Sequence, residues 1–275
     1  MPWIGKRWRN AEEVRQKEAD MPEFVWLRRG DKLPAVAVAQ LLLKRTGHAI
    51  SIDGDYGSRT TSAVREFQRM RQPLSVDGVI GQKTWPRLAT HEHLPILDCI
   101  DIFDPDLLSS EAKFLTATGA NPILVGGMCN GIEQAVTDIR SRARNLFLLR
   151  FHGHGARGVA GVSDGHGDLG EHRSSFQNSP AVRRALGKLR GVFGPYGCIQ
   201  FMHCETGAGQ QGSRFLQMIA DATGVPATAA YRTQYASTLR ETLRYEGPTR
   251  TVCPGGRSLR AWARGLPEFA GMSVA

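Results

Sequence analysis

The sequence predicts a small all-α module followed by an α/β domain whose mostly parallel sheet is flanked by helices. Residues 31–90 contain one motif twice, and each copy leads into a helical pattern. From residue 96 onward, short apolar runs alternate with helical patterns, which is typical of a parallel sheet with crossover helices. The length of 275 residues agrees with this division, because domains of about 150 residues are common.

The composition is that of a globular protein with a basic surface. Hydrophobic residues make up 41% and charged residues 22% of the chain, so widespread disorder is not expected. No apolar run approaches the roughly 20 residues that a membrane-spanning helix needs, so no such helix is predicted. The net charge of +9 favours anionic partners such as nucleic acid, acidic lipid or wall polymers. Because the sequence carries no nucleic-acid motif, we predict no nucleic-acid partner.

Residues 1–30 are predicted to be a basic arm with one helix, capped by Asn10. The arm has no apolar segment of about 7–15 residues, so no Sec signal peptide is predicted. The location is left open between the cytoplasm and export to the cell envelope by a signal-independent route. The five cysteines are an odd number, which predicts at least one free thiol rather than a disulfide framework.

The module at residues 31–90 has a predicted helix over Val36–Leu43 and two copies of the motif D-G-x-x-G-x-x-T, Asp53–Thr60 and Asp77–Thr84. Asp and Gly favour a tight turn, and Thr stands where a helix begins. With the intervening Phe67-Gln68, the pattern resembles the peptidoglycan-binding-like domain, a small three-helix module.

That resemblance implies binding of peptidoglycan, through its stem peptides or glycan or as an anionic wall polymer. The predicted binding residues are Asp53, Tyr56 and Asp77. Turn chemistry alone would also explain these residues. The same kind of module also serves as a docking or autoinhibitory domain, and that alternative stays open.

Residues 91–95 are predicted to be a linker, and residues 96–275 the α/β domain. The last part, from Arg232, is predicted to be irregular except for a helix near Ser258–Arg264. The other predicted strands are Ile96–Ile102, Pro122–Val125, Leu146–Phe151, Ile199–Met202 and Val225–Ala230, and the helices are Asn130–Ala143, Pro180–Leu189 and Gly212–Ala222.

Two predicted strands end in residues suited to nucleophilic catalysis. Leu146–Phe151 runs into His152-Gly153-His154-Gly155, and Ile199–Met202 runs into His203-Cys204 with a Gly-rich stretch and a helix behind it. Sites in parallel sheets lie beyond the carboxyl ends of the strands. A thiol nucleophile needs a base within hydrogen-bond reach, and these two strand ends supply both groups.

These residues resemble the caspase-like cysteine peptidases, including metacaspases and related bacterial domains. Gly153-His154-Gly155 matches the histidine context of the metacaspase-like form, and Cys204 followed by Gly207 and Gly212 resembles a bacterial branch. The resemblance covers about residues 95–235. It implies a caspase-like fold and hydrolysis of a peptide or protein substrate, with no cofactor and no metal.

Carried over residue by residue, the resemblance implies Cys204 as the nucleophile and His154 as the general acid/base. The backbone N–H of Gly155, with that of Cys204, would form the oxyanion hole. His152 is the rival base, and His203 is interpreted as structural. Candidates for the substrate pocket are Tyr231, Arg232 and Gln234, just after a predicted strand. Arg232 would bind an acidic side chain of the substrate, and an ordinary surface arginine is the alternative.

Two other functions stay open on the sequence alone. A zinc hydrolase would draw on the many His, Cys and Asp residues of the second half, although there is no H-E-x-x-H helix and no His follows Cys204. A non-catalytic wall-binding protein with a degenerate caspase-like fold is the third possibility. The residues available to zinc are His152, His154, Asp164, His166, Asp168, His172, His203 and Cys204.

Overall fold

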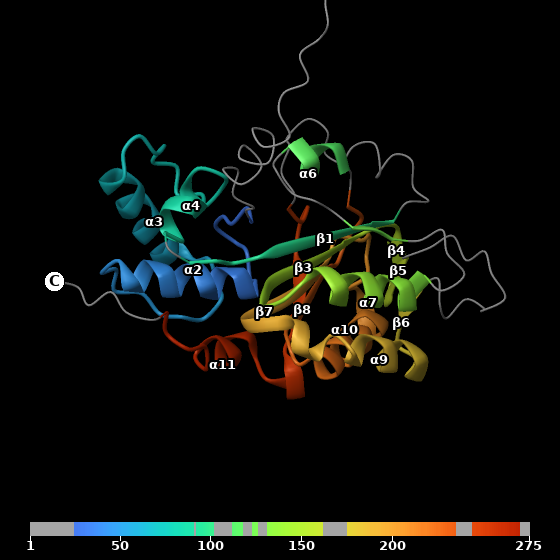
Figure 1. Ribbon diagram of the computed structural model, residues 1–275. Helices are drawn as coiled ribbons and strands as arrows, with labels where there is room; N and C mark the ends of the chain where they lie inside the picture. Colours follow the sequence, from blue (N-terminus) through green and yellow to red (C-terminus); the bar gives the residue numbers. More distant parts are fainter. Residues whose placement is uncertain are drawn as a thin grey trace, which may run out of the picture.

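The structure is a computed structural model, shown in Figure 1. The part of the chain that it describes comprises residues 25–90, 92–101, 112–117, 123–125, 131–161, 175–234 and 244–269. The predicted N-terminal arm helix therefore lies outside the described residues.

A helical unit opens the described chain, as predicted. It contains helices α2 (Pro34–Arg45), α3 (Ser58–Met70) and α4 (Thr84–Leu88). Pro34 starts α2, where its missing N–H costs no helical hydrogen bond. The apolar face of α3 is buried at Ala63, Val64 and Phe67, which is the helical spacing seen in the sequence.

The α/β region is built on a six-stranded sheet in the order β2-β1-β3-β7-β8-β9. The first five strands of that order are parallel, and β9 pairs antiparallel with β8. The strands are β1 (Ile96–Asp101), β2 (Ile123–Val125), β3 (Leu146–His152), β7 (Phe193–Phe201), β8 (Ala227–Ala230) and β9 (Thr249–Val252).

Strand β9 corrects the prediction that the last part of the chain is irregular apart from one helix. Its sequence, Thr-Arg-Thr-Val, is short and largely polar, and all four residues are half-buried. A strand at the sheet edge needs only one buried face, so it carries no continuous apolar run to reveal it.

Helices cover one face of this sheet, below it in Figure 1. They are α7 (Gly131–Arg142), α9 (Pro180–Gly187) and α10 (Gly209–Thr223). Their apolar residues form one buried cluster with the side chains of Leu149, Phe151, Ile199 and Phe201 on that face. The remaining short helices are α6 (Lys113–Ala117), α11 (Leu259–Ala263) and the 3₁₀ turns Arg190–Val192 and Pro254–Gly256.

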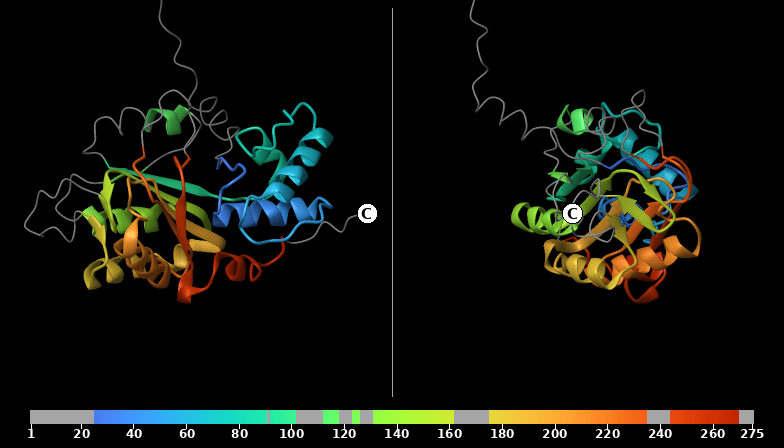
Figure 2. Two further views of the ribbon diagram at one scale, coloured as in Figure 1. Left: turned by 180° about the vertical axis from the view of Figure 1, so that it is seen from behind. Right: turned by 90° about the vertical axis from the view of Figure 1, so that its right-hand side faces the viewer.

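A small second sheet, absent from the sequence prediction, lies at the end of the main sheet away from α2–α4 (Figures 1 and 2). It consists of β4 (Gly155–Ala156), β5 (Val159–Gly161) and β6 (Ser175–Gln177). A two-residue turn joins β4 to β5, with Gly158 at φ +75°. Such turns require positive φ, which glycine adopts without strain.

The helical unit and the sheet share a buried cluster. Trp85 of α4 stacks on Phe147 of β3, with ring centroids 6.0 Å apart, and Leu148 and Cys198 belong to the same cluster. The segment between them is held as well, because Phe147 N–H donates to the Pro95 carbonyl at 2.9 Å. The division into domains at residues 91–95 stays a prediction. Among the described residues, no helix is long and apolar enough to cross a membrane.

Candidate functional site

The two strand ends identified in the sequence are neighbours in the sheet. Strands β3 and β7 pair in parallel with Phe151 opposite Phe201. The Met202 N–H donates to the Phe151 carbonyl at 2.8 Å, so the contact continues past the end of β7. The two strand ends, which a thiol and its base require to be close, are therefore adjacent in the sheet. The segments that begin at His152 and His203 leave the sheet at the same edge.

The hairpin that follows His154 is hydrogen-bonded to the loop that contains Cys204. Gly158 N–H donates to the Thr206 carbonyl at 3.1 Å, and the Thr206 hydroxyl donates to the Val159 carbonyl at 2.8 Å. His203 Nε2 lies 3.0 Å from the Gly161 carbonyl. Three contacts thus hold the β4–β5 hairpin on residues 203–206, which brings the two motifs into one structural unit.

Gly155 is the point of closest approach between these two segments. A Cβ at this position would lie 2.6 Å from Thr206 Oγ1 and 2.7 Å from His203 Cβ, so a side chain is excluded. Gly161 N–H donates to the His154 carbonyl at 2.8 Å, and Ala156 faces Val159 across the turn. In an antiparallel ladder, hydrogen-bonded pairs alternate with pairs that are not hydrogen-bonded to each other. Gly155 and Ala160 form a pair of the second kind, so the Gly155 N–H points away from β5. The Gly155 N–H can therefore donate a hydrogen bond to an acceptor other than β5.

Cys204 is the half-buried thiol of the described chain. Its Sγ accepts from the Gln234 N–H at 3.2 Å and donates to the Gln234 carbonyl at 3.4 Å. Cys99, Cys198 and Cys253 are buried, and burial raises the pKa of each of these three thiols. The fifth cysteine, Cys129, lies outside the described residues.

The residue after the thiol, Glu205, has an unusual backbone. Its φ is +52°, a conformation that non-glycine residues adopt rarely. Its N–H donates to the Arg232 carbonyl at 3.1 Å, and its side chain, 41% exposed, lies 3.6 Å from Arg157 Nε. The negative charge beside Cys204 is therefore directed to solvent and faces a cation. Arg232 is itself exposed and adjoins the thiol loop through this backbone contact.

The three histidines near this edge have different surroundings. His154 is exposed at the start of the hairpin, whereas His152 and His203 are buried. Burial lowers the pKa of His203 to about 3, so this ring is neutral and its Nε2–H donates to Gly161. This agrees with its interpretation as a structural residue. Of the three, His154 has the access to solvent that a base acting on a bound substrate needs.

His152 belongs to a buried charged cluster that the sequence analysis missed. Asp98 accepts two hydrogen bonds from Arg150, at 2.6 and 2.9 Å, and lies 2.8 Å from His152 Nε2. Burial raises the pKa of Asp98, but the charge of Arg150 and the hydrogen bond with His152 outweigh it and hold that pKa at about 2. The sequence signal for this cluster was the presence of the charged residues Asp98 and Arg150 inside two apolar strands, because a buried charge needs a partner.

Metal ligation was the alternative chemistry for these histidines. Within the described residues, no group of three or more His, Cys, Asp or Glu side chains could hold a metal ion. His166, His172, Asp164 and Asp168 lie outside the described residues.

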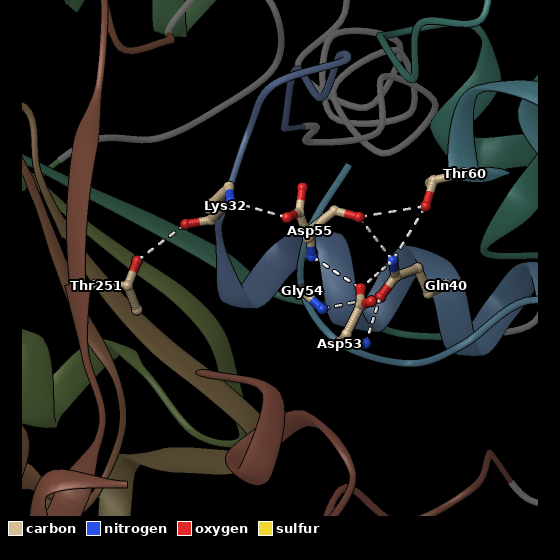
Figure 3. A network of polar contacts seen from close by, with 7 residues as sticks. All are labelled: Lys32, Gln40, Asp53, Gly54, Asp55, Thr60 and Thr251. Carbon is tan, nitrogen blue, oxygen red and sulfur yellow. Dashed lines mark hydrogen bonds and ion pairs between the residues drawn. The ribbon is translucent and has the colours of Figure 1, made fainter. Parts of the chain in front are cut away.

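In the helical unit, Gln40 holds the first motif loop together (Figure 3). Its Nε2 donates to Asp53 Oδ1, the Asp55 carbonyl and Thr60 Oγ1 at 2.8–3.1 Å. Its Oε1 accepts from the N–H groups of Asp53 and Gly54, both at 2.9 Å. One buried amide thus satisfies the backbone of the whole turn.

Gln68 makes the equivalent contacts in the second copy. Its Nε2 donates to Asp77 Oδ1, the Val79 carbonyl and Thr84 Oγ1, and its Oε1 accepts from the Gly78 N–H. Neither glutamine was identified from the sequence as the centre of its loop, although Phe67-Gln68 was part of the recognised pattern. Their spacing to the motif differs between the copies, 13 residues in one and 9 in the other.

These contacts give the predicted binding residues a structural role. Asp53 and Asp77 each accept a hydrogen bond from the side-chain amide of a glutamine. Tyr56 is fully buried, and its hydroxyl donates to the Gly78 carbonyl at 2.9 Å. Tyr56 therefore links the two copies. Their contact with a wall polymer stays a prediction. A surface hollow of about 260 Å³ beside the first loop is lined by Asp53 together with Asp55, Arg59 and Thr60.

Comparison with known proteins supports the assignment of the helical unit. Residues 32–88 match the family described as "Putative peptidoglycan binding domain". A peptidoglycan-binding protein from Clostridioides difficile, solved in complex with glutamine hydroxamate, is 40% identical over 23% of this chain and 39% of its own, with a TM-score of 0.22. The Burkholderia AP3 phage endolysin is 33% identical over 34% of this chain and 36% of its own, with a TM-score of 0.23.

This chain therefore spans well under half the length of either solved structure. No curated protein matches it. The chain thus has a helical unit that matches this family over residues 32–88, followed by an α/β region.

Proposed function

We propose that this protein is a cysteine hydrolase that cleaves peptide bonds and is held at the cell wall by its peptidoglycan-binding domain. The observation that carries the proposal is the joining of two segments at one sheet edge: the hairpin after His154 is hydrogen-bonded to the loop after Cys204. A thiol and an imidazole on neighbouring strand ends are the minimum that this chemistry needs.

In the proposed reaction the Cys204 sulfur attacks the carbonyl carbon of the scissile peptide bond. His154 accepts the thiol proton and then gives it to the leaving amine as the C–N bond breaks. Water hydrolyses the resulting thioester, with His154 taking a proton from the water and returning it to the sulfur. Cys204 and His154 are thus the proposed catalytic residues.

The Gly155 N–H supports a proposal for the oxyanion hole. It points away from β5, and Gly155 lies against residues 203–206, next to the thiol segment. Together with the Cys204 N–H it would bind the carbonyl oxygen as negative charge develops there. Each such donor is worth about 3 kcal/mol in the transition state.

Arg232 is the proposed specificity residue. Its carbonyl accepts from Glu205 N–H, so its backbone is fixed one residue from the thiol, while its side chain is exposed. A guanidinium in this position would bind a carboxylate of the substrate through paired hydrogen bonds. We therefore expect substrates with an acidic residue before the scissile bond. The peptide can belong either to peptidoglycan or to a protein.

Wall binding is tested with the full chain. The protein is mixed with purified wall sacculi and centrifuged at low and at high salt. We expect it to pellet at low salt, and the bound fraction should fall with salt because surface attraction from a net charge of +9 is screened. Protein that stays in the supernatant at low salt would contradict wall binding and favour the docking or autoinhibitory role.

Hydrolysis is tested by mass spectrometry of the products released from sacculi and from a peptide library. We expect cleavage that survives EDTA and is lost in Cys204→Ala and in His154→Ala. His93→Ala, an exposed histidine outside the site, is the matched control and should leave cleavage unchanged. Cleavage that survives Cys204→Ala contradicts the proposal, and cleavage that EDTA stops and zinc restores shows a zinc hydrolase. Binding without any cleavage shows a wall-binding protein.

A further inference from the structure

A second pocket lies where the helical unit meets the sheet. It has a volume of about 170 Å³, and we call it the junction pocket; its walls include Trp26, Asp31, Lys32, Gln200, Arg244 and Tyr245. The lining residues come from two walls: the segment before α2 forms one, and β7 with the chain leading into β9 forms the other. The two walls are tied together by the Thr251 hydroxyl, which donates to the Lys32 carbonyl at 3.1 Å (Figure 3).

A polar row on one face of the sheet leads to this pocket. The pairing of strands β1, β3, β7 and β8 places Asp98, Arg150, Gln200 and Thr228 side by side, and all four are at least 97% buried. Thr228 continues the row through its hydroxyl to Thr251 at 2.9 Å. A buried polar row in the middle of a sheet is costly unless its groups find partners.

Two donors in that row have no partner within the described part of the chain. They are Gln200 Nε2 and Arg150 Nη1. Gln200 is only 3% exposed and belongs to the lining of the junction pocket. Buried donors without an acceptor are rare in folded proteins, and each one calls for an explanation. An acceptor atom seated in the pocket would provide one for Gln200.

The pocket lining carries charges of both signs. Lys32 and Arg244 are cationic and Asp31 is acidic, and the Lys32 ammonium is paired with Asp55 at 2.9 Å, so Arg244 is the cation that would meet an anionic group. The Asp31 carboxylate is already engaged, because it accepts from the Arg28 N–H at 2.7 Å. Val25, Leu33 and Pro248 supply apolar walls. A monoanion with a small apolar part matches this lining.

Size limits the ligand further. An engineered protein cavity of about 150 Å³ holds a benzene molecule, so the junction pocket has room for a group of about that size. A carboxylate carried by one small residue fits this space and its charge, whereas a folded segment or a long side chain does not.

We propose that the junction pocket binds the free carboxylate at the end of a short peptide whose last residue is small. The Gln200 amide and Arg244 would bind the carboxylate, and the apolar wall would contact the small side chain. Stem peptides of the wall and ordinary protein ends share this chemistry and differ in the handedness of their last residues. The proposal does not depend on the chemistry at Cys204.

The test uses the full chain with its tryptophan indole nitrogens labelled with ¹⁵N. The chain has five tryptophans, and Trp26 lines the pocket; its signal is assigned with Trp26→Phe. The probes are N-acetyl-alanyl-alanine in its L,L and D,D forms and the corresponding C-terminal amides. We expect the acids to shift the Trp26 signal saturably, and the amides to bind at least tenfold more weakly because a charged hydrogen bond is lost. The enantiomer that binds more tightly identifies the source.

Two variants check the proposed contacts. Gln200→Met keeps the size of the side chain and removes the donor, and Arg244→Gln removes the charge from a half-buried position. Each should weaken binding of the acid about tenfold or more, whereas Arg264→Gln, exposed and outside the lining, should not. Equal binding of acid and amide, no shift of Trp26 with any probe, or full binding in Arg244→Gln would overturn the proposal. Arg244→Gln also keeps the test valid if Gln200→Met fails to fold.

Discussion

Replacing Gln68 by leucine tests the account of the helical unit, because one buried amide holds the second motif loop. Leucine has a similar size, so packing changes little and the loss is one of hydrogen bonds. The Gly78 N–H and the Thr84 hydroxyl, both buried, lose their partner, as does the Val79 carbonyl, whereas Asp77 Oδ1 keeps the bond from the Val79 N–H.

The magnitude follows from the two fully buried groups. An unsatisfied buried donor or acceptor costs about 1–3 kcal/mol, so the free energy of unfolding should fall by roughly 2–6 kcal/mol. With a urea m value of about 2 kcal/mol/M, even a loss of about 3 kcal/mol lowers the midpoint by about 1.5 M. This is a large share of the roughly 5–15 kcal/mol that holds a typical domain together.

The assay is urea unfolding followed by tryptophan fluorescence, since Trp85 lies in the cluster beside this loop. Gln40→Leu should show a similar loss, because Gln40 makes the equivalent contacts in the first copy. Gln82→Leu is the matched control, as Gln82 is exposed and should change stability by less than about 0.5 kcal/mol. A loss under about 1 kcal/mol in both Gln68→Leu and Gln40→Leu would refute the reasoning.

Three further predictions concern the α/β region and its junction. Burial lowers the pKa of His203 from 6.5 to about 3, so between these values the unfolded chain binds a proton that the native state does not. Stability should therefore fall as the pH falls through this window, and urea midpoints at several pH values should fall less steeply in His203→Asn; equal slopes would contradict this. Gly155→Ala should cost about 1–3 kcal/mol in a thermal melt by forcing the hairpin off residues 203–206, whereas Gly187→Ala, whose Cβ would lie 4.0 Å from the Ala222 carbonyl oxygen, should not; no difference between them would refute the close approach. Limited proteolysis at residues 91–95 should give two fragments that still co-elute from a sizing column, because Trp85 and Phe147 share one cluster; fragments that elute separately would argue against a shared core.

The elements with strong periodicity could be predicted from the sequence. The apolar run Leu146–Phe151 predicted β3 to within one residue, and the motif copies located α3 and α4. The alternation of strands and helices predicted a parallel sheet, and β3 and β7 do pair in parallel. The adjacency of the two candidate catalytic segments was expected from their chemistry, because a base must reach the proton that it removes, and not from the strand pattern.

Features that depend on long-range contacts could not be predicted in the same way. Gln40 and Gln68 look like ordinary polar helix residues, and only the folded loops show that their amides are buried. Strand β9 is stabilised by its pairing with β8, and the β4–β5 hairpin by its contact with residues 203–206, rather than by their own sequences. The Asp98–Arg150 ion pair joins residues 52 positions apart, a distance over which local patterns carry no information.

The rate at which iodoacetamide alkylates Cys204 in the native protein tests the central claim most directly, because it reports a thiol activated by His154. Peptide mass spectrometry resolves the five cysteines in one experiment. We predict that Cys204 reacts far faster than buried Cys99, Cys198 and Cys253, and that His154→Ala slows it at least tenfold at neutral pH, since the imidazole no longer takes the thiol proton. His93→Ala should leave the rate unchanged. Equal rates in the wild type and His154→Ala, or a Cys204 no faster than the buried thiols, would contradict the proposed catalytic pair.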